Sequence, residues 1–386
     1  MKSKKFLYSG LTLLSMATLT ACSLGTSSTT TSGQNVTATS SSSTATTVTS
    51  DIDWDSLPTK NVTLSSDTLN ITETGTYVLS GETTAGVTIN TSGNVRIILA
   101  GATISSSDSA AINVEAAENV EIELKDGTEN TVKDANSHSN TDIEGAIHSE
   151  ANLIVSGSGS LKVEANYQDG IVSTDNLIIN GGNLTVTAAD DAIRGKDSVT
   201  INGGTLNLTA TGDGIKSNND EDTSKGNVTI TNGNITVKAG DDGIKAESSL
   251  VIDGGDIKVS ESAEALEGTN ITINGGTIDA YATDDGINAA SDVTGADIFI
   301  KVTGGDIKVE VGEGDTDGFD ANGDIYISGG TIAVTAQSAF DFDDTAELTG
   351  GTVTVNGEQI TEITATGPGA GGPGGGAPGG NAPGGW

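Results

Sequence analysis

The chain has 386 residues and a formal net charge of −36, from 53 acidic and 17 basic residues. This charge makes nucleic acid a poor partner, because nucleic-acid binding needs a basic footprint, and an anionic polysaccharide is repelled unless divalent cations mediate the contact. With only two histidines, His138 and His148, and one cysteine, the chain has little material for a zinc site or a Ser-His-Asp triad. Both histidines are expected to be ordinary surface or loop residues.

Residues 1–22 have the pattern of a bacterial lipoprotein signal peptide, in which a lysine-rich start precedes an apolar stretch too short and interrupted to span a membrane. The stretch ends in Leu-Thr-Ala-Cys, which resembles a lipoprotein cleavage site, so Cys22 is the expected lipidation site. The alternative is a secretory signal that happens to contain a cysteine. Residues 23–54, rich in Ser and Thr, are expected to form a flexible linker. The predicted location is extracellular, with the lipid anchor on the outer face of the bacterial cell membrane as the only membrane contact.

Residues 55–362 repeat one glycine-containing motif, as in TINGGTLNL and VIDGGDIKV. Successive motifs are about 22 residues apart, with occasional insertions, which is the mark of a solenoid. A series that begins at Gly159 continues through the second glycine of each motif, at Gly182, Gly204, Gly233, Gly255, Gly276, Gly305, Gly330 and Gly351. These corner glycines are expected to take left-handed backbone angles.

We predict an all-β fold, a right-handed parallel β-helix with about 22 residues and three short strands per turn. An array of hairpins or a β-sandwich is the competing fold, since NGG between apolar residues is also a hairpin signal. The longer repeats argue against it, because their extra residues, 217–226 and 290–297, fall at the same corner. Val, Ile and Leu are expected to stack inside. The polar corner residues Asn180, Asn202, Asp253 and Asn274 are expected to bond along the axis. Residues 363–386, rich in Gly and Pro, are expected to be a disordered tail.

Acidic residues recur at a second corner of the repeat, nine residues after the corner glycine in most turns, and are followed by a small and then an apolar residue. Glu264 takes the place of aspartate in one turn. Acids one turn apart are well spaced to share a calcium ion, which prefers carboxylate and carbonyl oxygens. The predicted calcium ligands are Asp169, Asp190, Asp191, Asp213, Asp241, Asp242, Asp284, Asp285, Asp317 and Asp320.

Such a column cannot stay bare, because unit charges about 4.8 Å apart repel by about 3.5 kcal/mol at an effective dielectric constant near 20. Protonation, bound calcium or neighbouring basic residues could each relieve the repulsion. Arg194, Lys216 and Lys245 stand three residues beyond their acids, so a lysine-compensated acidic face is the alternative to a calcium column.

The lipoprotein signal, Ser/Thr linker, INGGT and DDGI turns and Gly/Pro-rich tail together resemble a bacterial carbohydrate-binding β-helix family first recognised in cellulolytic clostridia. That resemblance implies a parallel β-helix similar to pectate lyases, bound calcium, and binding to cellulose and acidic sugars without established catalysis. It carries the calcium role to the acids of the matching turns, Asp191, Asp213, Asp242 and Asp285. The sequence departs from the Asp-Gly pattern at Ala192 and at Glu264-Ala265.

Three functions are compatible with these features. The first is a non-catalytic, calcium-dependent cell-surface protein that binds plant cell-wall polysaccharide, either acidic sugars such as polygalacturonate or cellulose. The second is a calcium-dependent pectate lyase, in which Lys216 or Lys245 would remove the C5 proton of a uronate. The third is a surface adhesin or scaffold. Repetition favours binding over catalysis, because a unique active site should break the repeat.

Overall fold

A computed structural model describes residues 52–314 and 316–365. The predicted signal peptide, Cys22, most of the linker and most of the tail lie outside the described residues. From Asp53 onward the described chain belongs to one compact unit. None of its helices is long and apolar enough to cross a membrane. A short 3₁₀ helix, η1 (Trp54–Ser56), precedes the strands.

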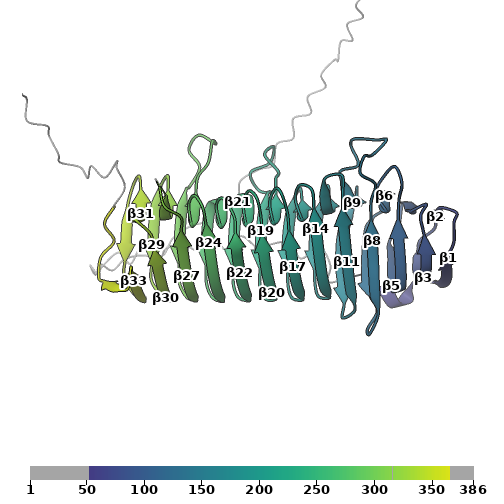
Figure 1. The fold of residues 1–386 in the computed structure, drawn as a ribbon, viewed down its shortest axis with the longest axis horizontal. Helices are drawn as coiled ribbons and strands as arrows, with labels where there is room; N and C mark the ends of the chain where they lie inside the picture. The colour runs from purple at the N-terminus through teal and green to yellow at the C-terminus, as the bar shows by residue number, and fades with distance from the viewer. Residues whose placement is uncertain (1–51, 315, 366–386) are drawn as a thin grey trace, which may run out of the picture. The chain divides into compact units, whose positions relative to one another are not determined.

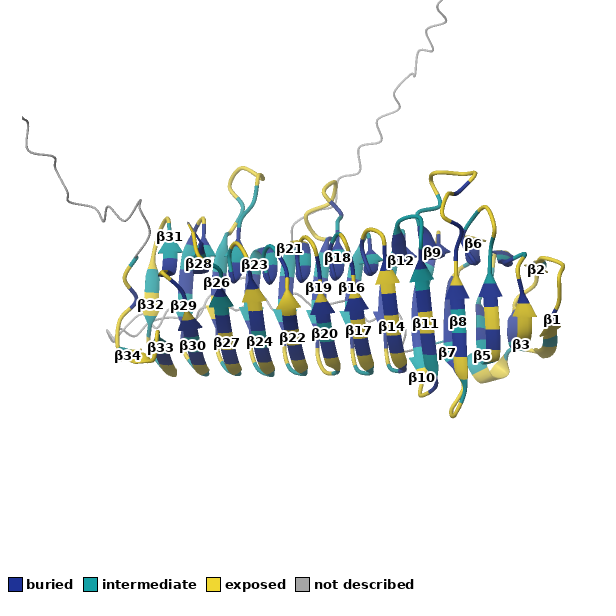
Figure 2. Cartoon of the chain, viewed as in Figure 1, coloured by how far each residue is buried: buried dark blue, intermediate teal, exposed yellow. Residues whose placement is uncertain are grey.

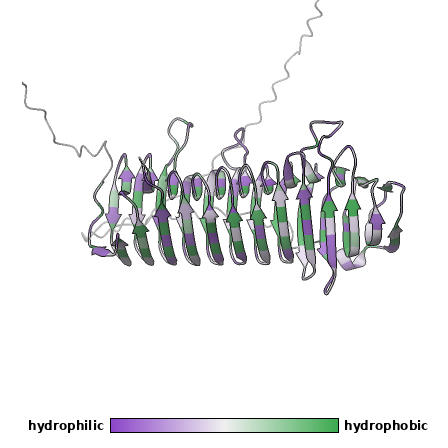
Figure 3. Cartoon of the chain, viewed as in Figure 1, coloured by the Kyte–Doolittle hydropathy of each residue, from purple (hydrophilic) through white to green (hydrophobic). Residues whose placement is uncertain are grey.

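Alternating apolar and polar residues produce short strands that bury every second side chain. In β14 (Asn183–Ala188), for example, exposed and buried residues alternate along the whole strand. Figure 3 shows the resulting mixture of apolar and polar bands along the row of strands. Each strand pairs in parallel with its counterpart in the turns before and after it, so the strands form three ladders (Figure 1).

The first ladder contains β2 (Leu69–Ile71), β4 (Val87–Asn90), β6 (Ile112–Ala116), β9 (Gly145–Ser149), β12 (Asp169–Ser173), β15 (Ile193–Gly195), β18 (Ile215–Ser217), the first parts of β21 (Ile244–Ile252) and β23 (Leu266–Ile273), β25 (Ile287–Ala289), β28 (Asp317–Ala321) and β31 (Ser338–Phe342). The second ladder contains β1 (Thr59–Leu64), β3 (Gly75–Thr83), β5 (Val95–Ser105), β7 (Asn119–Leu124), β10 (Asn152–Gly157), β13 (Asn176–Ile179), β16 (Ser198–Ile201), β19 (Asn227–Ile230), the second parts of β21 and β23, β26 (Phe299–Val302), β29 (Asp324–Ile327) and β32 (Ala346–Leu348). The third ladder contains β8 (Glu129–Lys133), β11 (Ser160–Ala165), β14, β17 (Thr205–Thr209), β20 (Asn234–Lys238), β22 (Asp256–Glu261), β24 (Thr277–Ala282), β27 (Asp306–Val311), β30 (Thr331–Thr335) and β33 (Thr352–Val355). The last strand, β34 (Glu358–Ile360), pairs antiparallel with β33.

The three ladders enclose an interior, and we call the stacked turns that they form the coil. The core consists of aliphatic side chains stacked in register inside the coil. Ile193 pairs with Ile215, and Ile215 pairs with Ile244, and all three are fully buried. Near the C-terminal end the same column continues as Phe319 and Phe340, whose ring centroids are 5.3 Å apart. Figure 2 shows the buried strands as dark bands, with exposed residues concentrated at the corners and in projecting loops.

The corner glycines adopt the predicted left-handed backbone. From Gly182 to Gly351 all eight second glycines of the motif have φ between 80° and 125°. The prediction for the first member of the series was wrong, because the positive φ falls at Gly157 and not at Gly159. A side chain at these corners would also meet the previous turn: a Cβ on Gly204 would lie 2.9 Å from the carbonyl oxygen of Gly182.

Polar side chains bond along the axis at two corners. Asn202 donates to Asn180 at 2.9 Å and Asn274 donates to Asp253 at 2.8 Å, which confirms the predicted corner column. A second column, which the sequence reasoning missed, links Asn94, Asn119, Asn152, Asn176 and Ser198 through bonds of 2.7–3.0 Å. Asparagine suits such a column because its amide is both donor and acceptor, so identical side chains satisfy one another.

The predicted all-β, mainly parallel fold is confirmed in the described residues, while the handedness and the length of its turn stay predictions. The strands β21 and β23 each run from the first ladder into the second, and neither strand has a loop between its two parts. The two long insertions lie in the turns before and after β21 and β23. Residues 217–226 run from the end of β18 to β19, and residues 290–297 lie between β25 and β26.

The two glycines of one corner provide a matched test of the backbone argument. We expect G204A to lower the free energy of unfolding by about 1–3 kcal/mol, because its left-handed backbone and the close Gly182 carbonyl both oppose a side chain. G203A should change it by less than about 0.5 kcal/mol, because Gly203 lacks a positive φ and its Cβ would make an ordinary contact of 3.4 Å. Urea-unfolding midpoints compare the two, and equal losses would contradict the account.

Candidate functional site

The recurring acids stand in register at the start of the first-ladder strands. We call this set the acid ladder; it comprises Asp169, Asp191, Asp213, Asp242, Glu264, Asp285 and Asp317. The small residue after each acid is buried inside the coil. At Gly243 a Cβ would lie 2.6 Å from the Ala265 carbonyl oxygen and 2.7 Å from a methyl of Val259. Close packing of the third ladder therefore requires the small residue, and no left-handed backbone is involved.

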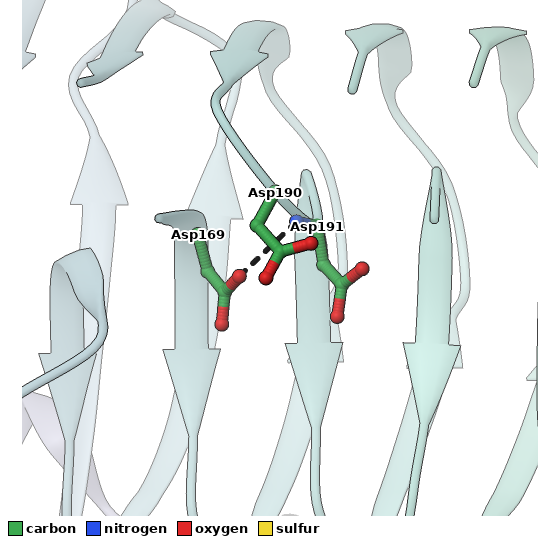
Figure 4. Close-up of side chains that lie close together, drawn as sticks. All are labelled: Asp169, Asp190 and Asp191. Carbon is green, nitrogen blue, oxygen red and sulfur yellow. Dashed lines mark hydrogen bonds between the residues drawn. The ribbon is translucent and has the colours of Figure 1, made fainter. Parts of the chain in front are cut away.

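The first four ladder acids are buried, with exposed fractions of 3%, 4%, 1% and 0%. Their side chains run along the ladder: the Oδ1 of Asp169 accepts the Asp191 backbone N–H at 3.1 Å, as Figure 4 shows. Asp191 and Asp213 repeat this bond to the next acid at 2.8 Å each, and Asp285 repeats it to Asp317 at 2.7 Å. One oxygen of each of these carboxylates thus has a structural role.

The other carboxylate oxygen meets a cation in this part of the ladder. Arg194 contacts the Oδ2 of Asp169 at 2.6 Å and also pairs with Glu144. Lys216 bridges Asp213 at 2.6 Å and Asp191 at 3.4 Å. Burial nevertheless raises the pKa of Asp169 to about 7 and that of Asp213 to about 6, against the opposing effect of these cations. Basic neighbours thus offset part of the charge repulsion from Asp169 to Asp213, and the raised pKa values let protonation offset more of it as the pH falls.

The cations belong to a second register column on the outer face of the first ladder, which we call the charge stripe. It comprises Arg194, Lys216, Lys245, Glu267, Asn288, Asp320 and Asp341. Its sign changes along the coil, from three basic residues to a mainly acidic series. Since the acid ladder keeps its sign throughout, charge balance is lost after Lys245.

The change of sign produces a cluster of three carboxylates around one lysine. Ligand oxygens of Asp242, Glu264 and Glu267 lie within 4.8 Å of one another. Lys245 contacts Asp242 at 2.8 Å and also Glu267. Asn288 donates to Glu264 at 3.2 Å. One ammonium group thus faces three carboxylates, which leaves a local charge of −2 when all are ionised.

Within this cluster the Oδ1 of Asp242 is buried and accepts no hydrogen bond from an ordinary donor of the described residues. The ladder bond that the neighbouring acids make is missing here, at a step that directly follows a register shift between Val237 and Lys238. Of the neighbouring carboxyl groups, Glu264 and Glu267 could each donate to Asp242 when protonated. Burial and the Asp242 charge raise the pKa of Glu264 to about 9 and that of Glu267 to about 7. Burial opposes ionisation of Asp242, but hydrogen bonds from these two groups and from Lys245 lower its pKa to about 2.

Toward the C-terminal end, Asp320 lies among further acids. Burial, followed by the charges of Asp285, Asp317, Asp341 and Asp343, raises its pKa to about 7. The charge of each group opposes ionisation of the next. This end of the column therefore shares the charge imbalance of the Asp242 cluster.

The remaining predicted ligands, Asp190, Asp241 and Asp284, are exposed. Oxygens of Asp190 come close to those of Asp169 and Asp191, and oxygens of Asp241 come close to those of Asp213 and Asp242. Sequence reasoning left Glu264 and Glu267 out of the predicted ligand set. Both were detectable, because Glu264 has the spacing of the ladder and Glu267 stands where the previous turn has Lys245.

A polar cavity of about 200 Å³ opens over the basic part of the stripe. Its lining includes Asp190, Arg194, Lys216, Gln168 and Asn218. Burial lowers the pKa of Lys216, but its interactions with Asp213 and Asp191 outweigh burial and raise the pKa above the ordinary value, which opposes loss of its proton. The same holds for Lys245, whose pKa is raised by Asp242 and Glu267. A base must lose its proton easily, so these lysines suit charge balance better than proton abstraction.

Both histidines are buried, so the expectation of surface or loop residues is met by His138 only in its loop position and was wrong for His148, which lies in a strand. His138 does lie in a loop, between β8 and β9, but its ring contacts Asp134 at 3.1 Å and the Ile143 carbonyl and packs 4.4 Å from Tyr167. His148 lies in β9 and contacts Glu150 at 3.1 Å. Both ring nitrogens of His138 are occupied, which leaves none to activate a nucleophile. Its role is to attach the loop to the coil.

Comparison with known proteins gives three similarities. A family model described as "carbohydrate-binding domain-containing protein" matches residues 65–318. A protein of the same description from Acetivibrio thermocellus is 35% identical over 128 residues, which are 31% of this chain and 45% of that protein, so the chain spans less than half of that relative. The polysaccharide lyase-like protein from C. thermocellum, solved as a gadolinium derivative, is 30% identical with a TM-score of 0.50, over 62% of this chain and 91% of that one.

The buried Asp169 should make stability depend on pH. The folded chain holds the Asp169 proton up to about pH 7, whereas the unfolded chain loses it near pH 4. Stability therefore falls as pH rises through this window. In D169N the fall should be smaller, by at most about 4 kcal/mol, since one pKa unit is about 1.4 kcal/mol. Urea unfolding at pH 4.5 and 7.5 measures both, with the exposed Asp256 as D256N for the control. Equal slopes in wild type and D169N would refute the assignment.

Proposed function

The chain belongs to the family of carbohydrate-binding domain-containing proteins, and we propose that residues 55–362 form a non-catalytic, calcium-dependent polysaccharide-binding domain. The proposed ligands are plant cell-wall glycans, either acidic sugars such as polygalacturonate or cellulose. The family match and the polysaccharide lyase-like similarity support a polysaccharide ligand. The coil presents a long series of outward polar side chains, which suits an extended polymer.

The finer architecture belongs to the same proposal. We infer that the coil is a right-handed parallel β-helix with turns of about 22 residues. Parallel crossover connections are right-handed in the great majority of proteins, which supports the handedness. We also propose that Cys22 carries a lipid anchor and that residues 23–54 tether the domain to the outer face of the cell membrane.

The buried Oδ1 of Asp242, which receives no hydrogen bond from a backbone N–H or from Lys245, is the observation that carries the calcium proposal. Beside it stand Glu264 and Glu267, so three carboxylates meet one lysine. A hard divalent cation that takes oxygen ligands fits this donor set and its charge of −2. The residues that would hold it are Asp242, Glu264 and Glu267. The similar protein was solved as a gadolinium derivative, and gadolinium is likewise a hard cation that takes oxygen ligands.

The fit differs along the column. Asp169, Asp190, Asp191, Asp213 and Asp241 lie in the part where basic residues already neutralise the ladder, so calcium there must displace an arginine or lysine. In the C-terminal part the stripe itself becomes acidic, and we propose Asp285, Asp317 and Asp320 as further ligands, with Asp284 exposed beside them. When bound, calcium would supply positive charge for a uronate carboxylate, which the bare protein repels.

The contacts of Lys216 and Lys245 favour a binding function over a lyase function. A lyase needs a base near its calcium, and the two lysines of the stripe have raised pKa values and hold carboxylates. Arg194 has a raised pKa as well, for its contacts with Asp169 and Glu144 outweigh its burial. These groups therefore act as fixed charges in the proposed function.

Glu264 should separate metal binding from stability. We expect E264Q to leave the unfolding midpoint in chelator close to the wild-type value, because the raised pKa of Glu264 already keeps its carboxyl protonated without calcium, and to reduce the upward shift that calcium produces. D190N, in the neutralised part of the column, should keep the wild-type shift. Thermal unfolding with EDTA and with calcium measures both effects. If D190N lost the calcium-induced shift of the unfolding midpoint and E264Q kept it, the ion would lie in the N-terminal part of the column, beside Asp190.

Sedimentation with polysaccharide tests the function itself. The purified protein should co-sediment with polygalacturonate in calcium and not in EDTA, and the ultraviolet absorbance of unsaturated product should stay flat. Cellulose is the uncharged comparison, for which retention should not need calcium. A rising absorbance would replace the proposal with the lyase. No retention by either polymer would favour an adhesin or scaffold.

A further inference from the structure

Two of the loops that interrupt the repeating turns enclose a cleft. The loops of residues 217–226 and 290–298 rise from the same edge of the coil, as Figure 1 shows. Between them β21 and β23 continue without a loop and form the floor. The cleft has a volume of about 280 Å³. The two loops stand three inter-strand steps apart, roughly 14 Å.

We propose that this cleft binds a segment of a neutral glycan, separately from the calcium-dependent column. The inference rests on the proposed polysaccharide-binding function and assigns a second site to it. The floor belongs to the turns that also carry Asp242 and Glu264, so both sites lie along the first-ladder strands at their opposite ends.

The first loop is built and held in place by the turn that precedes it. The Oδ1 of Asp197 accepts a bond from Asn219 at 2.8 Å, and its Oδ2 pairs with Lys225 at 2.7 Å. The Asp197 carbonyl oxygen accepts the Gly226 N–H at 2.8 Å. Asn219 in turn accepts two backbone N–H groups from within the loop. These bonds fix the wall before any ligand arrives, which reduces the entropy cost of binding.

The cleft offers polar groups that the fold does not use. Within the described part of the chain, no side-chain hydrogen bond is made by Asp220, Thr223, Glu247, Asn270, Thr294 or Asp297, all of which line the cleft. Asp191 and Asp213 of the acid ladder are the opposite case, because their oxygens are committed to backbone N–H groups and to Lys216. Hydroxyl, amide and carboxylate groups that converge on a cleft are suited to the hydroxyls of a sugar.

The charges of the cleft select against acidic sugars. Its lining holds three carboxylates, on Asp220, Glu247 and Asp297, and no lysine or arginine among the described residues. A uronate would meet like charge, whereas a neutral sugar can donate its hydroxyls to these carboxylates. Val293 adds an apolar contact for a ring face. It is 50% exposed, and it and Tyr281 are the exposed large apolar side chains of the described residues.

Calorimetric titration of the purified protein in EDTA tests the cleft, with cellohexaose, xylohexaose and mannohexaose as neutral probes and trigalacturonate as the acidic one. We expect at least one neutral probe to bind and trigalacturonate not to bind. N270A on the floor and the loop variant T223A/T294A should each weaken that binding by about five- to tenfold, as loss of one or two hydrogen bonds predicts. N207A, an exposed asparagine on β17 away from both loops, should bind as wild type does. Unfolding midpoints confirm that each variant is folded.

Two results would overturn the inference. Binding that survives both N270A and T223A/T294A would lie outside the cleft. No binding by any neutral probe would also end it, and retention on polygalacturonate in calcium would then show that the proposed function still stands. Failure of both assays would remove the proposed function as well.

Discussion

Identical residues one turn apart come to lie about 4.8 Å apart, and the whole structure depends on that constraint. For apolar residues the stacking is favourable, and Ile193, Ile215 and Ile244 form a continuous buried column. For asparagine it is also favourable, because each amide donates to one neighbour and accepts from the other. For carboxylates it is unfavourable, since like charges repel at this spacing. A repeating sequence therefore cannot repeat an acid without a compensating partner at each turn.

The acid ladder shows how far compensation extends. Backbone N–H groups take one oxygen of most ladder acids, and Arg194, Lys216 and Lys245 take the other. The stripe then changes sign at Glu267, and protons or a bound cation must replace the missing basic groups. The residues at this outward position of the first ladder thus balance the charge of one half of the acid ladder and add negative charge to the other half. The proposed cation binding lies in the part of the acid ladder where basic side chains do not balance the carboxylates.

Sequence reasoning found what depends on the repeat itself. The parallel strands, the left-handed glycines from Gly182 onward and the bonded corner asparagines all follow from residues that recur at one position. It failed where the backbone conformation, burial or hydrogen bonding of a residue depends on residues that are close in space but distant in the sequence. The start of the glycine series, the burial of His148 and the lack of a backbone partner at Asp242 depend on local packing and on one register shift, which no spacing reveals. Burial of the ladder acids was missed for the same reason.

The insertions and the change of charge lie in the same few turns. A regular coil offers the same surface at every turn, so it can bind a polymer only without a fixed position. The cleft floor on β21 and β23 and the Asp242 cluster both lie where the repeat is least regular. A cleft for a neutral sugar and a separate cation-dependent acidic cluster on the same turns would together fix one position on a glycan. The regular turns on either side then serve to hold that site rigid, because every strand of it is paired on both sides.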